Sequence, residues 1–255
     1  MDPMQTSGAR WAWLLAVTFV TATLVVVLVS LNITAPVPVI GDKATLPDII
    51  FANFAAARAS WPQDAGSACL YALGFLAVAV LGLVLRTTLD RSDPRAIRVA
   101  VLFILAGTIG ILSQVLYIGG REVAIAPYYC DCDYLAPQLI SRGAILDALV
   151  GMQAWMVDTF SFIFALGLLA VAGLAASARW STWFVVASRV LAVVAFASVA
   201  WDRIAVQLLI NASVDIDYGR IGLAILALIA GVGVPIWAAM LARTLSAPKA
   251  AESPA

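Results

Sequence analysis

The sequence contains no histidine, and only 12% of its 255 residues are charged. Without histidine the chain lacks the commonest general base, the commonest zinc and haem ligand and the usual pH switch. Fifteen Lys and Arg balance fifteen Asp and Glu, so no basic excess can neutralise nucleic-acid phosphates. A typical soluble domain is about 25% charged. Together with an apolar content of 63%, these shortages exclude a nucleic-acid binder, an ordinary cytoplasmic enzyme and a disordered chain.

The familiar catalytic fingerprints are missing as well. The chain has no Walker A loop, no glycine-rich dinucleotide turn, no HExxH and no Ser–His pair. We therefore expect no cofactor and no metal site, and a protein without enzymatic activity is favoured.

Long apolar runs dominate what remains. A bilayer core about 30 Å thick requires about 20 apolar residues in a helix. Six runs approach that length, at about 11–31, 69–85, 99–118, 157–176, 183–206 and 221–241. The first is longer than the core of a signal peptide, which favours a retained anchor. The sequence predicts an all-α, polytopic membrane bundle of six transmembrane helices, forming a single domain over 1–255 within the lipid bilayer.

Two segments between the spans, 32–68 and 121–146, form the predicted outer cap. In the first, Pro47 suits the start of a short helix. Four apolar residues of that helix share one face by their spacing: Ile50, Phe54, Ala57 and Trp61. This pattern predicts a short interfacial helix on the outer leaflet or a lid over the bundle. In the second segment, Pro137 is expected to begin a helix that continues into the fourth span.

The distribution of Lys and Arg predicts the orientation. The short turn from Arg86 to Arg98 is rich in arginine, and cytoplasmic loops carry such an excess. Both termini are therefore expected in the cytoplasm, with the chain as a multi-pass protein of the plasma membrane. The outer side is then acidic, and a protein partner or a lipid is the expected contact there.

All three cysteines fall on that outer side. Cys69 begins the second span, and Cys130 and Cys132 lie in the segment 121–146. In an oxidising compartment Cys69 can pair with either of the other two, which leaves one thiol free. The alternatives are inert thiols, redox exchange between Cys130 and Cys132, or a metal site with Asp131 and Asp133. The redox reading departs from the usual Cys-x-x-Cys spacing, and the metal reading lacks a histidine.

A wider spacing extends from this segment into the fourth helix. Cys130 and Cys132 are followed by Ser141, Gln153 and Trp155. The spacing resembles a segment of an uncharacterised family of bacterial six-helix membrane proteins. The resemblance covers residues 130–155 and implies a bacterial membrane protein, but no particular activity.

Four ionisable residues fall within predicted spans, where charges are costly and often functional. They form a candidate intramembrane polar site: Asp158, Arg189, Asp202 and Arg203. If the fifth span is 181–201, Arg189 lies about 12 Å deep. If it is 190–210, Arg189 lies at the inner interface and Asp202 and Arg203 enter the outer half. We expect an outer-half pair between Asp158 and Arg203, primarily as a structural tie.

Three functional hypotheses follow. The first is a non-enzymatic membrane protein, either a subunit of a larger complex or a small binding or sensor protein. The second is a small-molecule transporter that uses the intramembrane Asp and Arg residues. The third is an outer-face thiol oxidoreductase that uses Cys130 and Cys132.

Overall fold

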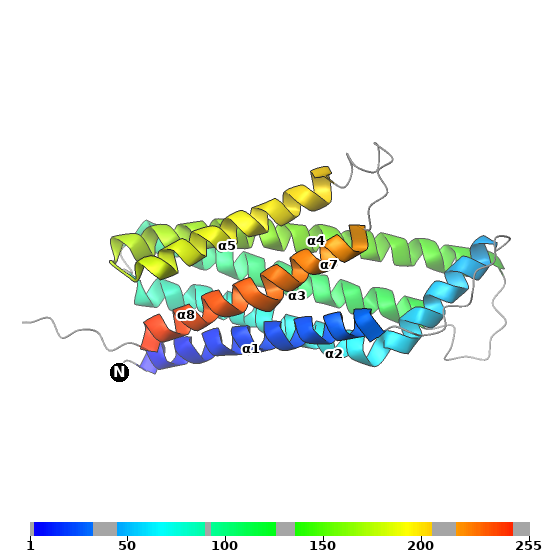
Figure 1. Cartoon of the computed structure of the whole chain (residues 1–255), viewed down its shortest axis with the longest axis horizontal. Helices are drawn as coiled ribbons and strands as arrows, with labels where there is room; N and C mark the ends of the chain where they lie inside the picture. The colour runs from blue at the N-terminus through cyan, green and yellow to red at the C-terminus, as the bar shows by residue number, and fades with distance from the viewer. Residues whose placement is uncertain (1–2, 33–44, 90–92, 126–135, 206–217, 247–255) are drawn as a thin grey trace, which may run out of the picture.

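Six long apolar helices make up the protein (Figure 1). The computed structural model describes residues 3–32, 45–89, 93–125, 136–205 and 218–246. The elements in chain order are α1 (Pro3–Asn32), α2 (Leu46–Thr88), α3 (Pro94–Ile125), α4 (Ala136–Ser177), α5 (Thr182–Ala200), the π-helical turn η2 (Trp201–Ala205), α7 (Tyr218–Leu228), the π-helical turn η3 (Ile229–Gly233) and α8 (Val234–Ser246). Within these ranges there is no strand, and the predicted all-α bundle of six membrane helices is confirmed.

The helices form a ring in which chain neighbours pack against each other. The pairs α1–α2, α2–α3, α3–α4 and α4–α5 are in contact, and α1 also packs against α8. The α5–α8 seam is the least extensive of the ring. The start of α1 and the end of α8 lie at the same end of the bundle (Figure 1), which we call the terminal end. The opposite end is the distal end.

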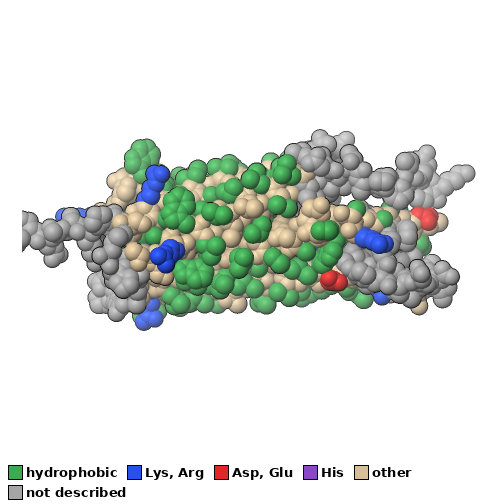
Figure 2. Space-filling view, turned by 90° about the horizontal axis from the view of Figure 1, so that it is seen from below, with side chains coloured by type: hydrophobic (Ala, Val, Ile, Leu, Met, Phe, Trp, Pro, Cys, Tyr) green, Lys and Arg blue, Asp and Glu red, His purple; other side chains and the backbone are tan. Residues whose placement is uncertain are grey.

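The outer surface of the ring is apolar between two charged ends. On the face in Figure 2, hydrophobic side chains cover the middle, and charged side chains lie only toward the two ends. Leu73, Leu83 and Leu112 are among the large apolar side chains that remain exposed. Such an unbroken apolar surface is what a bilayer requires of the segment it surrounds. The described arginines of the terminal end lie just beyond it or at its edge: Arg10, Arg86, Arg95, Arg98, Arg179, Arg189 and Arg243.

Small residues bring α2 and α3 close together. A Cβ atom on Gly107 would lie 2.5 Å from the carbonyl oxygen of Phe75 and 2.8 Å from the backbone nitrogen of Ala79. On the next turns, Gly82 faces Phe103 in the same way. Without a hydrophobic driving force between helices in lipid, such close packing supplies much of the attraction. The contacts also fix the antiparallel register of α2 and α3.

The terminal half of the interior is filled by aromatic rings. Phe103, Phe164 and Phe184 surround Trp237, with ring centroids 6.0 Å from that indole in each case. The indole nitrogen of Trp237 donates a 2.9 Å hydrogen bond to the Ser188 hydroxyl, so its polar atom is satisfied. We call these four rings the aromatic core.

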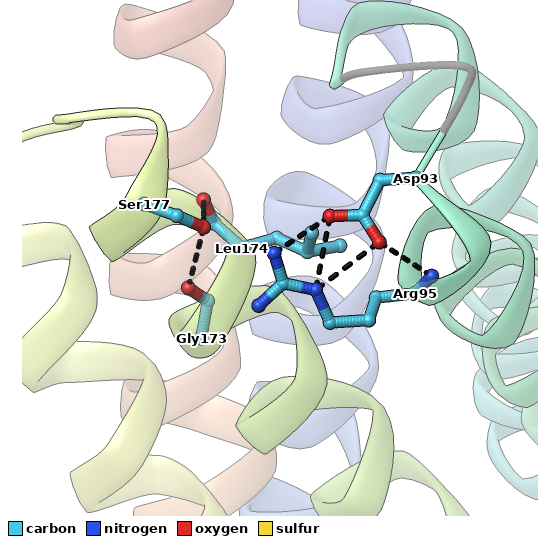
Figure 3. Close-up of polar contacts among 5 residues, drawn as sticks. All are labelled: Asp93, Arg95, Gly173, Leu174 and Ser177. Carbon is cyan, nitrogen blue, oxygen red and sulfur yellow. Dashed lines mark hydrogen bonds and ion pairs between the residues drawn. The ribbon is translucent and has the colours of Figure 1, made fainter.

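The turns at the terminal end are short and capped. Asp93 precedes Pro94, which suits the first position of a helix. Its carboxylate accepts a 2.8 Å hydrogen bond from the backbone N–H of Arg95 and pairs with the Arg95 guanidinium at 2.7 Å (Figure 3). These hydrogen bonds, first that of the Arg95 side chain, lower the pKa of Asp93. In the same view the Ser177 hydroxyl donates back to the carbonyls of Gly173 and Leu174 at the end of α4.

The predicted short interfacial helix is wrong as a separate element. A helix does begin where Pro47 suggested, and the carboxylate of Asp48 accepts a 2.8 Å hydrogen bond from the backbone N–H of Thr45. It then continues without a break through Pro62 into the second span, as the 43-residue α2. The predicted apolar face explains this continuity, because Phe54 and Ala57 are buried against Ile50 and against Leu146 of α4.

Helix α4 also continues without a break from the predicted outer cap into a membrane span. It begins at Ala136, as expected from Pro137, and its 42 residues continue into the fourth span. At 1.5 Å per residue, α2 and α4 are each about 60 Å long, twice the thickness of a bilayer core. Figure 1 shows their first parts extending beyond the other helices at the distal end. The described part of the predicted cap is therefore helical, made of the first parts of α2 and α4 and the last residues of α3. The remainder, 33–44 and 126–135, lies outside the described residues.

Candidate functional site

Buried polar side chains gather in the distal half of the interior. Seven of the described buried polar residues lie there: Thr23, Ser60, Asp64, Ser67, Ser113, Gln114 and Asp158. Thr18 lies at mid-depth and Ser188 lies beside the aromatic core. Buried polar groups are costly in a membrane unless they are bonded. Most described buried polar side chains therefore lie in the distal half of the interior, and the terminal half is mainly apolar.

One group of these residues joins α2 to α3. The Asp64 carboxylate accepts a 2.7 Å hydrogen bond from the Ser60 hydroxyl and lies 3.4 Å from Nε of Arg121. The Arg121 guanidinium also lies 5.4 Å from the ring centroid of Tyr117. Both residues fall in segments that the sequence assigns to the outer cap, so this ion pair was not predicted. The register of α2 and α3 could have predicted the pair. Phe75 and Gly110 face each other, and Asp64 and Arg121 each lie eleven positions farther toward the distal end.

This pair marks the distal edge of the apolar belt. Arg98 and Arg121 are 23 positions apart on α3, which corresponds to about 34 Å of helix. That length matches a bilayer core of about 30 Å with room for arginine side chains to reach the interfaces. The Asp64–Arg121 pair therefore serves as a reference level for the depth of other groups.

A second ion pair joins α4 to the turn η2. Nε of Arg203 donates to Oδ2 of Asp158, so the pairing predicted from the sequence is confirmed. The Arg203 guanidinium also lies over the ring of Trp155, with Cζ 3.9 Å from the centroid. Only 9% of the Asp158 side chain is exposed, against 30% for Arg203. The carboxylate is buried, and its cation also contacts an aromatic ring of the same helix as the carboxylate.

The Asp158–Arg203 pair lies well inside the apolar belt. Phe160 packs against Phe75, with ring centroids 4.6 Å apart. Phe75 is eleven positions from Asp64 on α2, and Asp158 is two positions distal of Phe160. The pair is therefore about 13 Å deeper than Asp64–Arg121.

Asp202 is the chain neighbour of Arg203 in this pair. The π-helical turn Trp201–Ala205 carries both Asp202 and Arg203, and π-turns are frequent at functional sites. Asp202 is exposed, and within the described part of the chain it forms no salt bridge. In Figure 1, α5 and η2 end short of the distal ends of α1 and α3, in agreement with the depth estimated from ring contacts. The structure thus brings Asp158, Asp202 and Arg203 together.

Arg189 is not part of this group. It lies 14 positions from Arg203 on the same helix, a separation of about 21 Å. Because α5 begins at Thr182, Arg189 lies about 10 Å from the terminal end of its helix, and Arg98 lies about 6 Å from the start of α3. Arg189 is exposed, so its long side chain can extend to the terminal interface with the other arginines.

The predicted cysteine staple is not formed. Cys69 is a free, exposed thiol on α2, and Cys130 and Cys132 lie outside the described residues. Among the residues that are described, no three His, Cys, Asp or Glu side chains are close enough to hold a metal ion. The structure therefore leaves Cys69 as an isolated thiol on the outer surface of the ring.

The position of Cys69 predicts its reactivity. It lies five positions from Asp64 toward the terminal end, about 7 Å inside the apolar belt. In proteoliposomes of the Cys130→Ser, Cys132→Ser variant, we expect a lipid-soluble maleimide to label Cys69 at least about ten times faster than a charged one, because the charged reagent is excluded from lipid whereas the lipid-soluble one can enter it.

A matched control lies on the same helix. A Gln63→Cys substitution in a background without other cysteines puts an exposed thiol next to the Asp64 level, where the charged reagent should react readily. Mass spectrometry of the labelled protein measures both rates. Complete protection of Cys69 in the unreduced native chain, released by a reductant, would instead support the disulfide.

No known protein family, curated protein or solved structure matches the chain. The resemblance of residues 130–155 to a bacterial membrane family receives no support from these comparisons. The function must therefore be argued from the geometry of the distal half.

Proposed function

We propose that this chain is a non-enzymatic membrane protein that recognises a ligand or partner with its distal half, as a small binding or sensor protein or as a subunit of a complex. The observation that carries the proposal is the polarity of the interior. Seven of the nine described buried polar side chains and both described interhelical ion pairs lie in the distal half, away from the aromatic core. Binding sites in helix bundles are built from such side chains on facing helices.

Among the described buried polar residues, Gln114 has hydrogen-bonding capacity that is only partly used. Its side chain is buried on α3, and within the described residues it donates one hydrogen bond, of 3.1 Å, to the neighbouring Ser113 hydroxyl. A primary amide has two donor hydrogens and a carbonyl acceptor. By the register of α2 and α3 it lies level with Tyr71, whose hydroxyl bonds Thr23 at 2.8 Å. A small polar ligand or lipid head group can use these remaining positions.

The charge distribution supports an outward-facing distal half. Seven of the eight described charges of the terminal end are arginines, whereas acidic and basic residues are nearly balanced among the described charges of the distal end. The positive-inside rule then puts the terminal end in the cytoplasm. We propose that both termini are cytoplasmic, that the chain resides in the plasma membrane, and that recognition takes place from the outer side.

Transport is a second candidate, favoured by the Asp158–Arg203 pair inside the apolar belt. Intramembrane ion pairs commonly mark substrate or proton routes. The aromatic core argues against this role, because Phe103, Phe164 and Trp237 fill the path from that pair to the terminal end. The thiol oxidoreductase hypothesis has no contact in its favour within the described residues.

Native mass spectrometry of the protein in lipid nanodiscs tests the proposal. We expect a bound non-protein mass or a partner chain on the wild type. A Gln114→Leu substitution should lower occupancy of a small ligand at least about tenfold, because the apolar side chain cannot replace the amide hydrogen bonds. The matched control is Thr108→Val, since Thr108 is an exposed polar residue of the same helix.

Recovery of the chain alone, with neither a bound mass nor a partner, would contradict the proposal. Transport has a separate readout. Proteoliposomes with an internal pH-sensitive dye should acidify no faster than empty liposomes when an external proton gradient is imposed. Acidification that depends on Asp158 would favour transport instead.

A further inference from the structure

The terminal end of the bundle carries more positive charge than its own acidic residues can balance. The stretches of sequence that lead into, connect or follow the helix ends there contain nine Lys and Arg against four Asp and Glu, over residues 1–10, 86–98, 177–190 and 243–255. An excess of five cations remains even if every carboxylate is paired. All seven arginines described there are exposed, and in the described part of the chain only Arg95 forms a salt bridge, with Asp93. Basic side chains are visible at this end on the face in Figure 2.

Arg98 of α3 lies beside α4 at the terminal edge of the apolar belt. It shares an exposed row of α3 with Leu105, seven positions later. The Cβ atom of Leu102 lies 3.6 Å from the position that a Cβ atom of Gly167 would occupy. Because α3 and α4 are antiparallel, Arg98 is therefore level with Val171 of α4.

Arg189 of α5 lies at the same level on the other side of α4. Phe196 packs against Phe162 of α4, with ring centroids 5.3 Å apart. Arg189 comes seven positions before Phe196, so it lies on the same side of α5 and is level with Leu169 of α4. The levels of Arg98 and Arg189 thus differ by about 3 Å, although α4 separates their helices.

The surface of α4 between the two arginines is open. Leu169 is 40% exposed. Gly173, one turn nearer the terminal end, is also exposed, and a Cβ atom added there would have nothing within 4 Å. We call Arg98, Leu169, Gly173 and Arg189 the Gly173 patch. It combines two cations with an apolar surface that continues into the belt.

We propose that the Gly173 patch binds an anionic phospholipid, with Arg98 and Arg189 holding the head group and the acyl chains lying along the apolar surface of α4 and α5. Guanidinium groups bind phosphate oxygens through paired, charge-assisted hydrogen bonds. Each basic side chain near a membrane surface also strengthens the attraction to anionic lipids. This site lies at the opposite end of the bundle from the proposed recognition site and does not depend on it.

Other occupants fit the patch less well. A soluble phosphate would meet the charge of the arginines but not the exposed Leu105 and Leu169, which lie on the hydrocarbon side. Phosphatidylcholine carries its own cation, which offsets the charge of its phosphate. In the distal half, by contrast, Arg121 and Arg203 are paired with carboxylates of the protein itself. The patch therefore favours an anion that is attached to hydrocarbon chains.

Titration of the full-length protein with two lipids tests the inference. In a nonionic detergent, native mass spectrometry measures the apparent dissociation constant of the first bound lipid. The lipids are phosphatidylglycerol and phosphatidylcholine with identical acyl chains. We expect the wild type to bind phosphatidylglycerol at least about tenfold more tightly. The double variant Arg98→Gln, Arg189→Gln should lose this preference and keep its affinity for phosphatidylcholine.

A second double variant distinguishes the patch from the total charge of the protein. Arg58→Gln, Arg142→Gln also removes two positive charges, but from the first parts of α2 and α4, beyond the distal edge of the belt. The preference for phosphatidylglycerol should remain in this control. Unaltered elution of both double variants in size-exclusion chromatography checks that they are folded.

Four results would overturn the inference. The first is equal binding of both lipids by the wild type. The second is the same loss of preference in both double variants, which indicates attraction by total charge. The third is equally tight binding of glycerophosphoglycerol, the head group without its chains, which identifies a soluble anion as the occupant. The fourth is a bound lipid that depends on Gln114 instead of the two arginines, which would support the distal site and refute this one.

Discussion

Replacement of Arg203 by leucine is expected to lower the free energy of unfolding by about 3 kcal/mol. The substitution leaves the carboxylate of Asp158 buried without its cation, and breaking one side of a buried pair costs about 3–5 kcal/mol. We take the lower end of that range because 30% of the Arg203 side chain is exposed. Unfolding by sodium dodecyl sulfate in mixed micelles, followed by far-ultraviolet circular dichroism, measures the change.

A variant that lacks both charges distinguishes the effect of the unpaired charge from the effect of lost side-chain packing. The double variant Asp158→Leu, Arg203→Leu should recover most of the lost stability, because no unpaired charge is left in the interior. Arg95→Leu is the matched control, since its ion pair with Asp93 lies at the surface with 54% of the Arg95 side chain exposed; little change is expected there. A double variant less stable than Arg203→Leu alone would show that the pair does not act through charge.

Substitution of Gly107 by alanine is expected to cost about 2–3 kcal/mol. Its new Cβ would lie 2.5 Å from the carbonyl oxygen of Phe75, and a backbone atom cannot rotate away as a side chain can. Helices α2 and α3 must then move apart, which forfeits packing along their whole interface. The same detergent unfolding measurement reports the loss.

Gly173 provides the matched control for Gly107. It lies on α4, and a Cβ atom added there would have nothing within 4 Å, so Gly173→Ala meets no obstacle. Because alanine favours a helix by about 1 kcal/mol over glycine, this variant should be as stable as the native chain or slightly more stable. Equal losses at Gly107 and Gly173 would show that close approach of α2 and α3 is not what stabilises the bundle.

The sequence predicted the membrane helices because lipid imposes a length and a composition on them. It also predicted the Asp158–Arg203 pair, since consecutive antiparallel helices bring residues at equal depth together. The register of the fifth helix stayed open until the structure showed α5 beginning at Thr182. Because Arg203 lies about 13 Å inside the distal edge of the belt and about 21 Å from Arg189, Arg189 falls near the terminal arginines, a position that composition alone did not decide.

The runs of apolar residues do not indicate the other features of the structure. The polar residues near Asp64 indicate where lipid ends, but a helix can continue into water, and α2 therefore begins at Leu46. The Asp64–Arg121 pair was missed because both residues were counted as loop charges. Finding it requires the register set by Gly107 and Phe75. No residue type in the sequence marks the π-turn at Trp201–Ala205, so it was not predicted.

The unbroken course of α2 through Pro62 has a mechanical consequence. Proline removes one backbone hydrogen bond and makes that point of a helix easier to bend. Pro62 lies 16 positions from Leu46, so rotating this lever arm by about 10° would displace its tip by about 4 Å. Ser60 and Asp64 lie on opposite sides of the pivot and are joined by a hydrogen bond. A load on the tip of α2 would therefore be transmitted to the carboxylate that holds Arg121 on α3.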